Sequence, residues 1–329
     1  MPLDPVLQGL LSQIPPAPTG AINFPELREQ SEAMLPLIIG PAGVVEVKSV
    51  ESHIIEGPVA EVPIRIYRPL GHPEGTLHFV HGGGWSVGNL VMTDPIARRL
   101  CRDLSMVVVA STYRLAPEHA FPAAYDDTLV AATWVRSHVA ELGGEQRPLL
   151  IGGDSAGANL VAAVCIGFRE HDQVARGISP DDCTARSFDL QLLLYPAVDL
   201  RENELDYPSR EADADPTLKM AAIRGLRAIY CGDSPADDWR ISPLAAADLS
   251  NLPPALIVVL QVDPLRDEAL IFADKLRASG VQVEVVEFDN LTHGFAHMAG
   301  IVPAAAVALG EVLDRVRSMV EGLATKHSG

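Results

Sequence analysis

The sequence predicts an α/β fold in which helices cover both faces of a mostly parallel, eight-stranded sheet. Two observations carry this prediction. Short, continuous apolar runs alternate along most of the chain with longer stretches of helical periodicity, as in sheets that are buried on both faces. Before this alternation begins, two β-branched segments joined by Glu56-Gly57-Pro58 indicate an antiparallel pair of strands.

Each expected element corresponds to a sequence segment. The antiparallel strands are expected at Val45–Ile55 and Val59–Tyr67, the second with alternating Val62, Ile64 and Ile66. The further strands are expected at Leu77–Val80, Val107–Ser111, Leu149–Ile151, Leu190–Leu194, Ala255–Gln261 and Val281–Phe288. The helices are expected at Thr93–Leu104, Ala124–Glu141, Ala156–Glu170, Leu265–Ser279 and Pro303–Leu323.

Two regions lie outside this alternation and predict a helical cap. The N-terminal region contains the helical pieces Val6–Gln13 and Phe24–Leu37, separated by a proline-rich stretch that no helix can cross. More than fifty residues separate Pro196 from Leu252, and they turn helical from Thr217 to Tyr230. A structureless loop of that length is rare in a compact domain. The domain prediction is therefore a cap of residues 1–45 and 197–247 and a main domain of residues 46–196 and 248–329.

The composition excludes several classes of function. The 329-residue chain has 43 Asp and Glu against 25 Lys and Arg, a formal net charge of −18. This charge repels nucleic-acid phosphates and anionic lipids, so neither nucleic acid nor membrane is an expected partner. The four cysteines form no Cys-x-x-Cys pair, which indicates neither a zinc site nor a disulfide framework. Since the sequence has no signal-peptide pattern and no long apolar run, a cytoplasmic location is expected.

A serine between two glycines stands where the apolar run Leu149–Ile151 ends and a helical segment begins. In Gly153-Asp154-Ser155-Ala156-Gly157, the glycines have no Cβ to clash where strand and helix crowd together. A nucleophile elbow of this kind presents the Ser155 hydroxyl above the sheet and the Ala156 N–H beside it. Taken alone, the pattern fits an ordinary strand-to-helix turn with a serine cap equally well.

A second glycine-rich loop, His81-Gly82-Gly83-Gly84-Trp85, follows the strand expected at 77–80. Consecutive glycines leave backbone N–H groups unobstructed, and those of Gly82 and Gly83 are predicted to form an oxyanion hole with that of Ala156. A phosphate cradle is the competing use of such a loop. It is disfavoured because no Lys-Ser or Lys-Thr pair follows and no Gly-x-Gly-x-x-Gly spacing is present.

A nucleophilic serine needs a base, and the base needs an acid that fixes its tautomer. In this type of sheet both follow the serine along the chain, each in a loop after a later strand. Asp263 directly follows the strand expected at 255–261 and is the predicted acid. Asp267 and Glu268 are rivals, but they fall in the first turn of the next helix, where acidic residues favour the helix macrodipole.

Three histidines follow Asp263 in the sequence. His293 lies in a loop after the last expected strand, with Gly294 beside it, and is the predicted base. His297 fits the start of a helix, and His327 lies in the C-terminal tail.

Five motifs occur in order along the chain: His81-Gly82-Gly83-Gly84-Trp85, Tyr113-Arg114-Leu115-Ala116-Pro117-Glu118, Gly153-Asp154-Ser155-Ala156-Gly157, Asp263-Pro264-Leu265-Arg266-Asp267-Glu268 and His293-Gly294-Phe295. The set resembles the bacterial hormone-sensitive-lipase-like esterases of the α/β-hydrolase superfamily, from about residue 45 to the C-terminus. The resemblance implies an α/β-hydrolase fold, a triad of Ser155, Asp263 and His293, and the oxyanion hole and cap described above. It also implies a homodimer through the last strand and its neighbouring helix, with no cofactor and no metal.

The function implied by this resemblance is that of a serine carboxylesterase, which hydrolyses short- to medium-chain acyl esters through an acyl-enzyme intermediate. Trp85 is predicted to bound the pocket for the small-molecule ester, while Arg114 and Glu118 are predicted to support the site structurally. Two positions depart from the family pattern. Ala158 stands where a second glycine is frequent, and Thr112 stands where an acidic residue is frequent.

Two alternative functions remain open. One is a non-catalytic small-molecule receptor on the same fold, which the presence of His293 disfavours. The other is an amidase, a deacetylase or a lactonase, because the same triad serves all of them.

Overall fold

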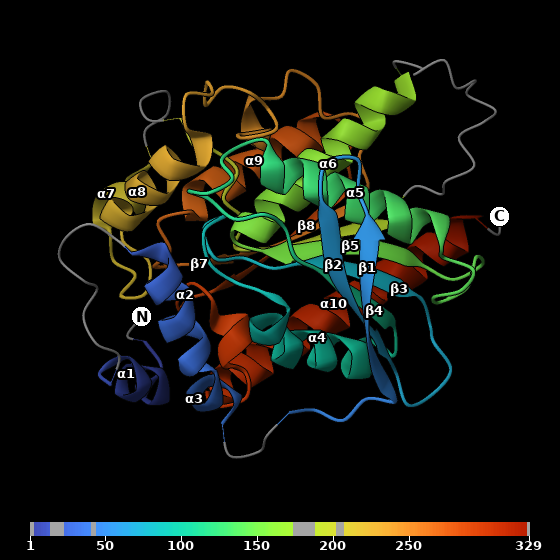
Figure 1. Ribbon diagram of the computed structural model, residues 1–329, viewed down its shortest axis with the longest axis horizontal. Helices are drawn as coiled ribbons and strands as arrows, with labels where there is room; N and C mark the ends of the chain where they lie inside the picture. The colour runs from blue at the N-terminus through green and yellow to red at the C-terminus, as the bar shows by residue number, and fades with distance from the viewer. Residues whose placement is uncertain (1–2, 14–22, 41–43, 174–187, 202–206, 328–329) are drawn as a thin grey trace.

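The computed structural model describes residues 3–13, 23–40, 44–173, 188–201 and 207–327. Its centre is an eight-stranded sheet with the strand order β1-β2-β4-β3-β5-β6-β7-β8 (Figure 1). β2 is antiparallel to both of its neighbours, and all other neighbouring strands are parallel. The predicted sheet and its leading antiparallel pair are confirmed. The strands are β1 Ser49–Glu56, β2 Glu61–Arg68, β3 Thr76–Val80, β4 Val107–Ser111, β5 Leu149–Asp154, β6 Leu190–Leu194, β7 Ala255–Leu260 and β8 Val283–Phe288.

The inner strands explain why the sequence shows continuous apolar runs. Strands β3 to β7 are buried along their whole length, because helices exclude water from both faces of the sheet. The edge strands β1 and β8 are partly exposed and carry charged side chains such as Glu51 and Glu287.

Two layers of helices cover the sheet (Figure 1). On one face lie α5 (Ala123–Ser137), α6 (Ala156–Gln173) and α9 (Arg266–Ala278), which share one hydrophobic core. On the other face, α4 (Leu90–Leu104) and α10 (Pro303–His327) contribute to a second core. The predicted covering of both faces is therefore confirmed.

The N-terminal region contains α1 (Pro5–Leu11), α2 (Phe24–Ala33) and α3 (Leu35–Ile39). The expectation of one continuous helix from Phe24 to Leu37 is wrong. Pro36 has no N–H to donate and its ring would clash with a carbonyl one turn earlier, so α2 ends and α3 begins just before it. Leu7 of α1 is fully buried in the core that α4 and α10 form.

The insertion after β6 contains α7 (Pro208–Ala212) and α8 (Met220–Cys231). The helix predicted from Thr217 begins at Met220, after a turn in which the backbone N–H and hydroxyl of Thr217 both donate to the Asp215 carboxylate. This side-chain turn replaces the first helical turn. In Figure 1, α2, α7 and α8 lie at the same end of the molecule.

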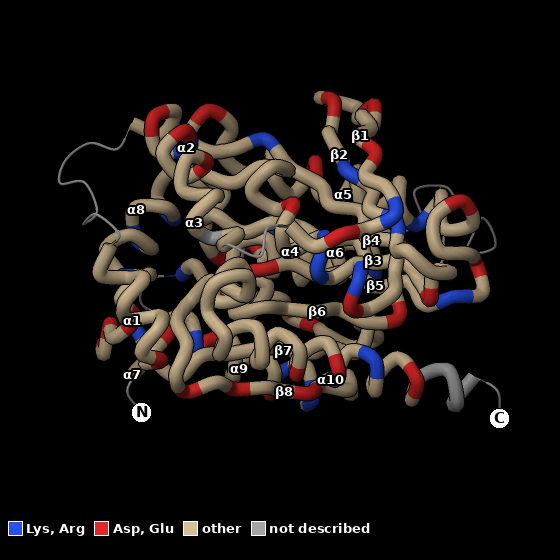
Figure 2. Tube along the Cα trace, turned by 90° about the horizontal axis from the view of Figure 1, so that it is seen from below, with Lys and Arg blue, Asp and Glu red and all other residues tan. Residues whose placement is uncertain are grey.

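Acidic residues are spread over the molecule and do not gather on one element, as Figure 2 shows. Several arginines are paired with them, among them Arg98 with Asp94 and Arg266 with Glu287. Within the described residues, no helix has the length and apolar character that crossing a membrane requires.

Candidate active site

The serine between the glycines lies in a sharp turn between β5 and α6. Ser155 adopts a φ of +52°, a left-handed conformation that non-glycine residues rarely take outside functional turns. Gly157 lets α6 approach the sheet, because a Cβ there would lie 2.1 Å from the carbonyl oxygen of Val80 in β3. The Ser155 hydroxyl lies 2.8 Å from His293 Nε2. The turn therefore presents its serine to a histidine, as a nucleophile elbow does.

The three residues predicted as a triad lie together at the ends of three strands. Asp263 follows β7 and His293 follows β8, while Ser155 follows β5. His293 Nδ1 lies 2.7 Å from Asp263 Oδ2, so the neutral imidazole can donate from Nδ1 and accept from the serine at Nε2. Asp263 is 1% exposed, and its other oxygen accepts the Leu265 N–H at 2.9 Å. The Leu265 N–H thus fixes the orientation of the Asp263 carboxylate, whose second oxygen contacts the histidine.

Opposing effects act on the charge of His293. Burial lowers its pKa, but the carboxylates of Asp263, Asp215 and Asp154 outweigh burial, and the pKa lies above the ordinary value. The ring of Tyr195 contacts the imidazole nearly edge-on, with 4.8 Å between the ring centroids. A base with a raised pKa takes a proton from serine more readily, provided that it is neutral at the working pH.

The glycine loop differs from the prediction that the Gly82 N–H contributes to an oxyanion hole. The Gly82 N–H donates to Asp154 Oδ1 at 2.9 Å and is therefore not free for an oxyanion. The next residue, Gly83, has a φ of +108°, and a Cβ there would lie 2.2 Å from the Val87 carbonyl oxygen, so only glycine fits. In the part of the chain that the structure describes, the N–H groups of Gly83, Gly84 and Ala156 donate to no protein acceptor.

His81 at the start of this loop is bonded through both ring nitrogens. Nδ1 lies 2.7 Å from the Gly82 carbonyl oxygen, and Nε2 lies 2.9 Å from Thr112 Oγ1. Burial lowers the pKa of His81, which favours the neutral ring. The hydroxyl of Thr112, which can donate or accept, therefore fits a neutral histidine partner.

His297 has a part in the site that the sequence analysis missed. Its Nε2 lies 3.1 Å from Asp154 Oδ2, so Asp154 bridges His297 and the Gly82 N–H. Burial lowers the pKa of His297, but Asp154 outweighs it and the pKa is raised. The position in the 3₁₀ turn Phe295–Met298 agrees with the expected helix start, yet the ring points back to the elbow. Its spacing of four residues from His293, one helical turn, was the available signal.

A cavity of about 720 Å³ opens above Ser155 and His293. The N-terminal helices and the insertion contribute apolar side chains to its wall, namely Leu27, Leu35, Leu218, Met220, Ile223 and Leu226. Trp85 is among the lining residues, but it is only 4% exposed and stacks on Tyr230 of α8 at 4.3 Å between ring centroids. Trp85 therefore both lines the cavity and packs against α8.

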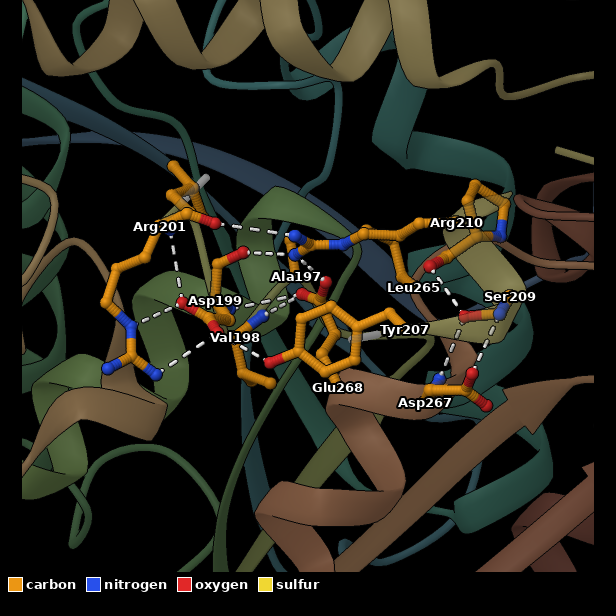
Figure 3. A network of polar contacts seen from close by, with 12 residues as sticks. Ala197, Val198, Asp199, Arg201, Tyr207, Ser209, Arg210, Leu265, Asp267 and Glu268 are labelled. Atoms are coloured by element: carbon orange, nitrogen blue, oxygen red, sulfur yellow. Dashed lines mark hydrogen bonds and ion pairs between the residues drawn. The ribbon is translucent and has the colours of Figure 1, made fainter. Parts of the chain in front are cut away.

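Asp267 and Glu268, the two alternatives to Asp263 as the catalytic acid, do not bond to His293. They bind the insertion after β6, as Figure 3 shows. Glu268 is fully buried; it accepts the N–H groups of Val198 and Asp199 at 2.8 and 3.1 Å and pairs with Arg210 of α7. Asp267 accepts the Ser209 N–H at 2.8 Å. Burial raises the pKa of Glu268 to about 7, against the lowering effect of Arg210.

The two supporting residues of the Tyr-Arg-Leu-Ala-Pro-Glu motif make ion pairs. Arg114 pairs with Asp127 of α5 at 2.8 Å. Glu118 pairs with Arg28 of α2 at 2.7 Å. Neither Arg114 nor Glu118 lines the cavity. Within the described ranges, no group of three His, Cys, Asp or Glu side chains is placed to hold a metal ion.

Known proteins resemble this chain along most of its length. The sequence profile of the alpha/beta hydrolase fold family matches residues 77–297. The chain is 35% identical to carboxylesterase NlhH of Mycobacterium tuberculosis over 322 residues, which cover 96% of this chain and 95% of NlhH. It is 37% identical to the carboxylic ester hydrolase LipN of the same species over 295 residues, 88% of this chain and 75% of LipN.

A solved structure extends the likeness to three dimensions. The hyperthermophilic esterase of the archaeon Pyrobaculum calidifontis superposes with a TM-score of 0.84 at 33% identity, covering 97% of this chain and 99% of the esterase. The chain therefore belongs to the α/β-hydrolase-fold family, among its hormone-sensitive-lipase-like carboxylic ester hydrolases.

Proposed function

We propose that the chain is a serine carboxylesterase that hydrolyses short- to medium-chain acyl esters through an acyl-enzyme intermediate. One observation carries the proposal: Asp263, His293 and Ser155 form a continuous series of contacts at 2.7 and 2.8 Å beneath the cavity. This series can deliver a proton from the serine hydroxyl to a base whose tautomer is fixed by a buried acid.

The proposed reaction has two halves. His293 Nε2 takes the Ser155 proton as the serine oxygen attacks the ester carbonyl, and the protonated ring then gives that proton to the leaving alcohol. Water attacks the acyl-enzyme in the second half, again giving its proton to Nε2, and the collapse of the tetrahedral intermediate returns the proton to Ser155. Asp263 remains ionised and stabilises the imidazolium that forms in each half.

The negative charge on the carbonyl oxygen needs donors that have no other partner. We assign this part to the N–H groups of Gly83, Gly84 and Ala156, because each lies at the elbow or its neighbouring loop and donates to no acceptor in the described chain. Gly82 takes a different part, since its N–H and Asp154 together hold the loop against the elbow. Removing one such donor typically costs about 10²–10³ in kcat.

The cavity wall supports the choice of substrate. Leucine and methionine side chains from α2, α3 and α8 face the space above Ser155, and apolar walls of this kind bind acyl chains. We propose that residues 1–45 and 197–247 form a cap that limits the acyl chain. Among nitrophenyl acetate, butyrate, octanoate and palmitate, the highest kcat/KM is expected at butyrate or octanoate; a maximum at palmitate would contradict this proposal.

Replacing the nucleophile tests the mechanism. Ser155→Ala is expected to abolish nitrophenyl ester hydrolysis and labelling by an organophosphate, while circular dichroism and thermal unfolding stay as in the unsubstituted protein. A folded Ser155→Ala protein with full esterase activity would contradict the assignment. A receptor without catalysis would leave the unsubstituted protein unlabelled, and a panel of amides and lactones would separate an esterase from an amidase, a deacetylase or a lactonase.

We further propose a homodimer that pairs through β8 and α10, because β8 is an edge of the sheet. Light scattering of the purified protein tests this assembly. The cytoplasmic location stays a prediction from the sequence.

A further inference from the structure

Asp215 lies in the irregular segment between α7 and α8, and its side chain is completely buried. A buried carboxylate is costly unless its oxygens accept hydrogen bonds. Asp215 meets this requirement with both oxygens. Oδ1 accepts from the Thr217 N–H at 2.7 Å and from Thr217 Oγ1 at 2.6 Å, which closes the turn before α8.

The second oxygen reaches the candidate active site. Asp215 Oδ2 accepts the backbone N–H of His293 at 2.6 Å, across 78 residues of sequence. Thr217 Oγ1 also lies 3.2 Å from the His293 carbonyl oxygen, so the Asp215–Thr217 turn lies against both backbone polar groups of the histidine. Both contacts come from the insertion, whereas His293 itself belongs to the loop after β8.

The loop around His293 needs such a contact. His293 is followed by Gly294, which has a φ of +79° and no side chain to restrain the backbone. The imidazole must keep 2.7 Å to Asp263 and 2.8 Å to Ser155 at the same time. A displacement of about 1 Å at a reacting group can cost about 10²-fold in rate.

We infer that Asp215 is a positioning residue for the catalytic histidine: through the His293 N–H, it couples the placement of the insertion to the alignment of His293 with Ser155. This inference rests on the proposed function. Asp215 does not touch Ser155; its hydrogen bond with His293 is made to the backbone N–H and not to the imidazole. An insertion that shifts away from the site thereby releases the base as well as opening the cavity.

The test compares two aspartates of the same segment. Asp213 makes a similar local contact, because its Oδ1 accepts the Met220 N–H at 2.9 Å, but it has no contact with His293. Asp215→Asn is expected to lower kcat about 10- to 100-fold while KM changes less than about threefold. Asp213→Asn is expected to leave both unchanged. Equal kcat values for Asp215→Asn and the unsubstituted protein, or equal losses in both variants, would overturn the inference.

A pH profile separates positioning from general stability. The titratable groups facing His293 are Asp263 after β7, Asp154 of β5, Tyr195 after β6, His297 of the 3₁₀ turn and Asp215 itself. Asp215 raises the pKa of His293, and activity needs the neutral ring, so kcat/KM falls as pH drops through that pKa. Asp215→Asn is expected to move this acid limb to lower pH, and an unmoved limb would count against the inference.

A readout without activity keeps the inference testable if the proposed function fails. We expect the proton between His293 Nδ1 and Asp263 to give a separate low-field proton resonance in NMR spectra, whose position depends on that contact. Asp215→Asn is expected to shift or broaden this resonance, whereas Asp213→Asn is expected to preserve it. Failure of organophosphate labelling would then refute the esterase mechanism alone, and an unshifted resonance would refute the positioning role alone.

If Asp215→Asn does not fold, Thr217→Val provides the milder variant, because it keeps both Asp215 oxygens and removes one hydroxyl, which contacts Asp215 Oδ1 and the His293 carbonyl oxygen. It is expected to lower kcat several-fold and to leave the thermal midpoint within a few degrees. A Thr217→Val protein with unchanged kcat and an unchanged His293 resonance would overturn the inference.

Discussion

Gly83 is the residue at which backbone geometry and proposed chemistry coincide most closely. Its φ of +108° disfavours any side chain, and a Cβ would lie 2.2 Å from the Val87 carbonyl oxygen. Gly83→Ala must therefore shift the loop that carries the proposed oxyanion donors. We expect kcat for nitrophenyl butyrate to fall about 10²–10³-fold, with circular dichroism unchanged.

The matched control is another glycine-to-alanine change. A Cβ at Gly225 of α8 would meet no atom within 4 Å, so alanine fits there. Gly225→Ala is expected to keep kcat and to stabilise the protein by about 0.5–1 kcal/mol. If Gly83→Ala retained the kcat of Gly225→Ala, the proposed part of the glycine loop in catalysis would be refuted.

Single residues could be predicted from the sequence only where chain order restricts the choice. Ser155, Asp263 and His293 follow from the order of strands, and the structure places their side chains in contact. The Gly82 prediction was wrong because the sequence does not reveal which N–H the Asp154 carboxylate takes. Asp215 has no motif of its own; its contact with His293 exists only because the insertion folds back over the β8 loop.

At the scale of elements, the contact between α7 and α9 includes a buried ion pair between Arg210 and Glu268. The Arg210 side chain is 15% exposed and the Glu268 side chain 0%, and both are drawn in Figure 3. Burial raises the pKa of Glu268 to about 7, above its ordinary 4.5, so the ionised form costs folding free energy as pH rises through this range. Arg210 offsets part of that cost, because it lowers the pKa of Glu268.

Removing Arg210 is therefore expected to destabilise the protein in a pH-dependent way. At pH 9, Arg210→Met leaves a buried carboxylate without its cation, and a loss of about 3–5 kcal/mol in the free energy of unfolding is expected. At pH 5, Glu268 is protonated in both proteins, so the loss is expected to be smaller. Urea denaturation at both pH values measures the difference.

A double variant provides the control. Glu268→Gln keeps an oxygen for the Val198 and Asp199 N–H groups, which share Oε1, and removes the titration. The further effect of Arg210→Met in that background is expected to be independent of pH. A pH-dependent effect that persists without Glu268 would contradict this account.

Elements could be predicted better than their ends. The inner strands lie where the sequence predicted them, because burial on both faces of the sheet selects continuous apolar runs that are visible in the sequence alone. The sequence did not predict α7, since five residues from Pro208 to Ala212 are too few to show a helical period. α8 begins three residues later than predicted, after a turn in which the Asp215 carboxylate accepts from Thr217, and no sequence pattern marks that turn.

At the scale of the whole molecule, the N-terminal helices and the main domain are joined by contacts that sequence patterns do not show. Arg28 of α2 lies 90 residues before Glu118 and pairs with it. The same guanidinium donates to the carbonyl oxygens of Ser86 at 2.8 Å and Ala116 at 2.9 Å. A cap could be expected from irregular sequence alone, but its attachment to the Tyr-Arg-Leu-Ala-Pro-Glu motif required the structure.

This attachment is expected to set how well longer acyl chains bind. Leu27 and Ser31 of α2 and Leu35 of α3 line the cavity, so loosening α2 removes apolar wall from the far end of a chain but not from the reacting carbonyl. For Arg28→Gln we expect kcat/KM for nitrophenyl octanoate to fall about tenfold, equivalent to about 1.4 kcal/mol. For nitrophenyl acetate the change is expected to stay within about threefold.

Arg277→Gln is the matched control, because Arg277 forms an exposed pair with Asp274 far along α9, and pairs of this kind contribute little. It is expected to change neither ester. Equal losses for acetate and octanoate in Arg28→Gln would point instead to the Ser86 contact, through which the glycine loop itself would be displaced. A selective loss for octanoate ties acyl-chain preference to the docking of α2, because only a chain long enough to reach Leu27 can sense that wall.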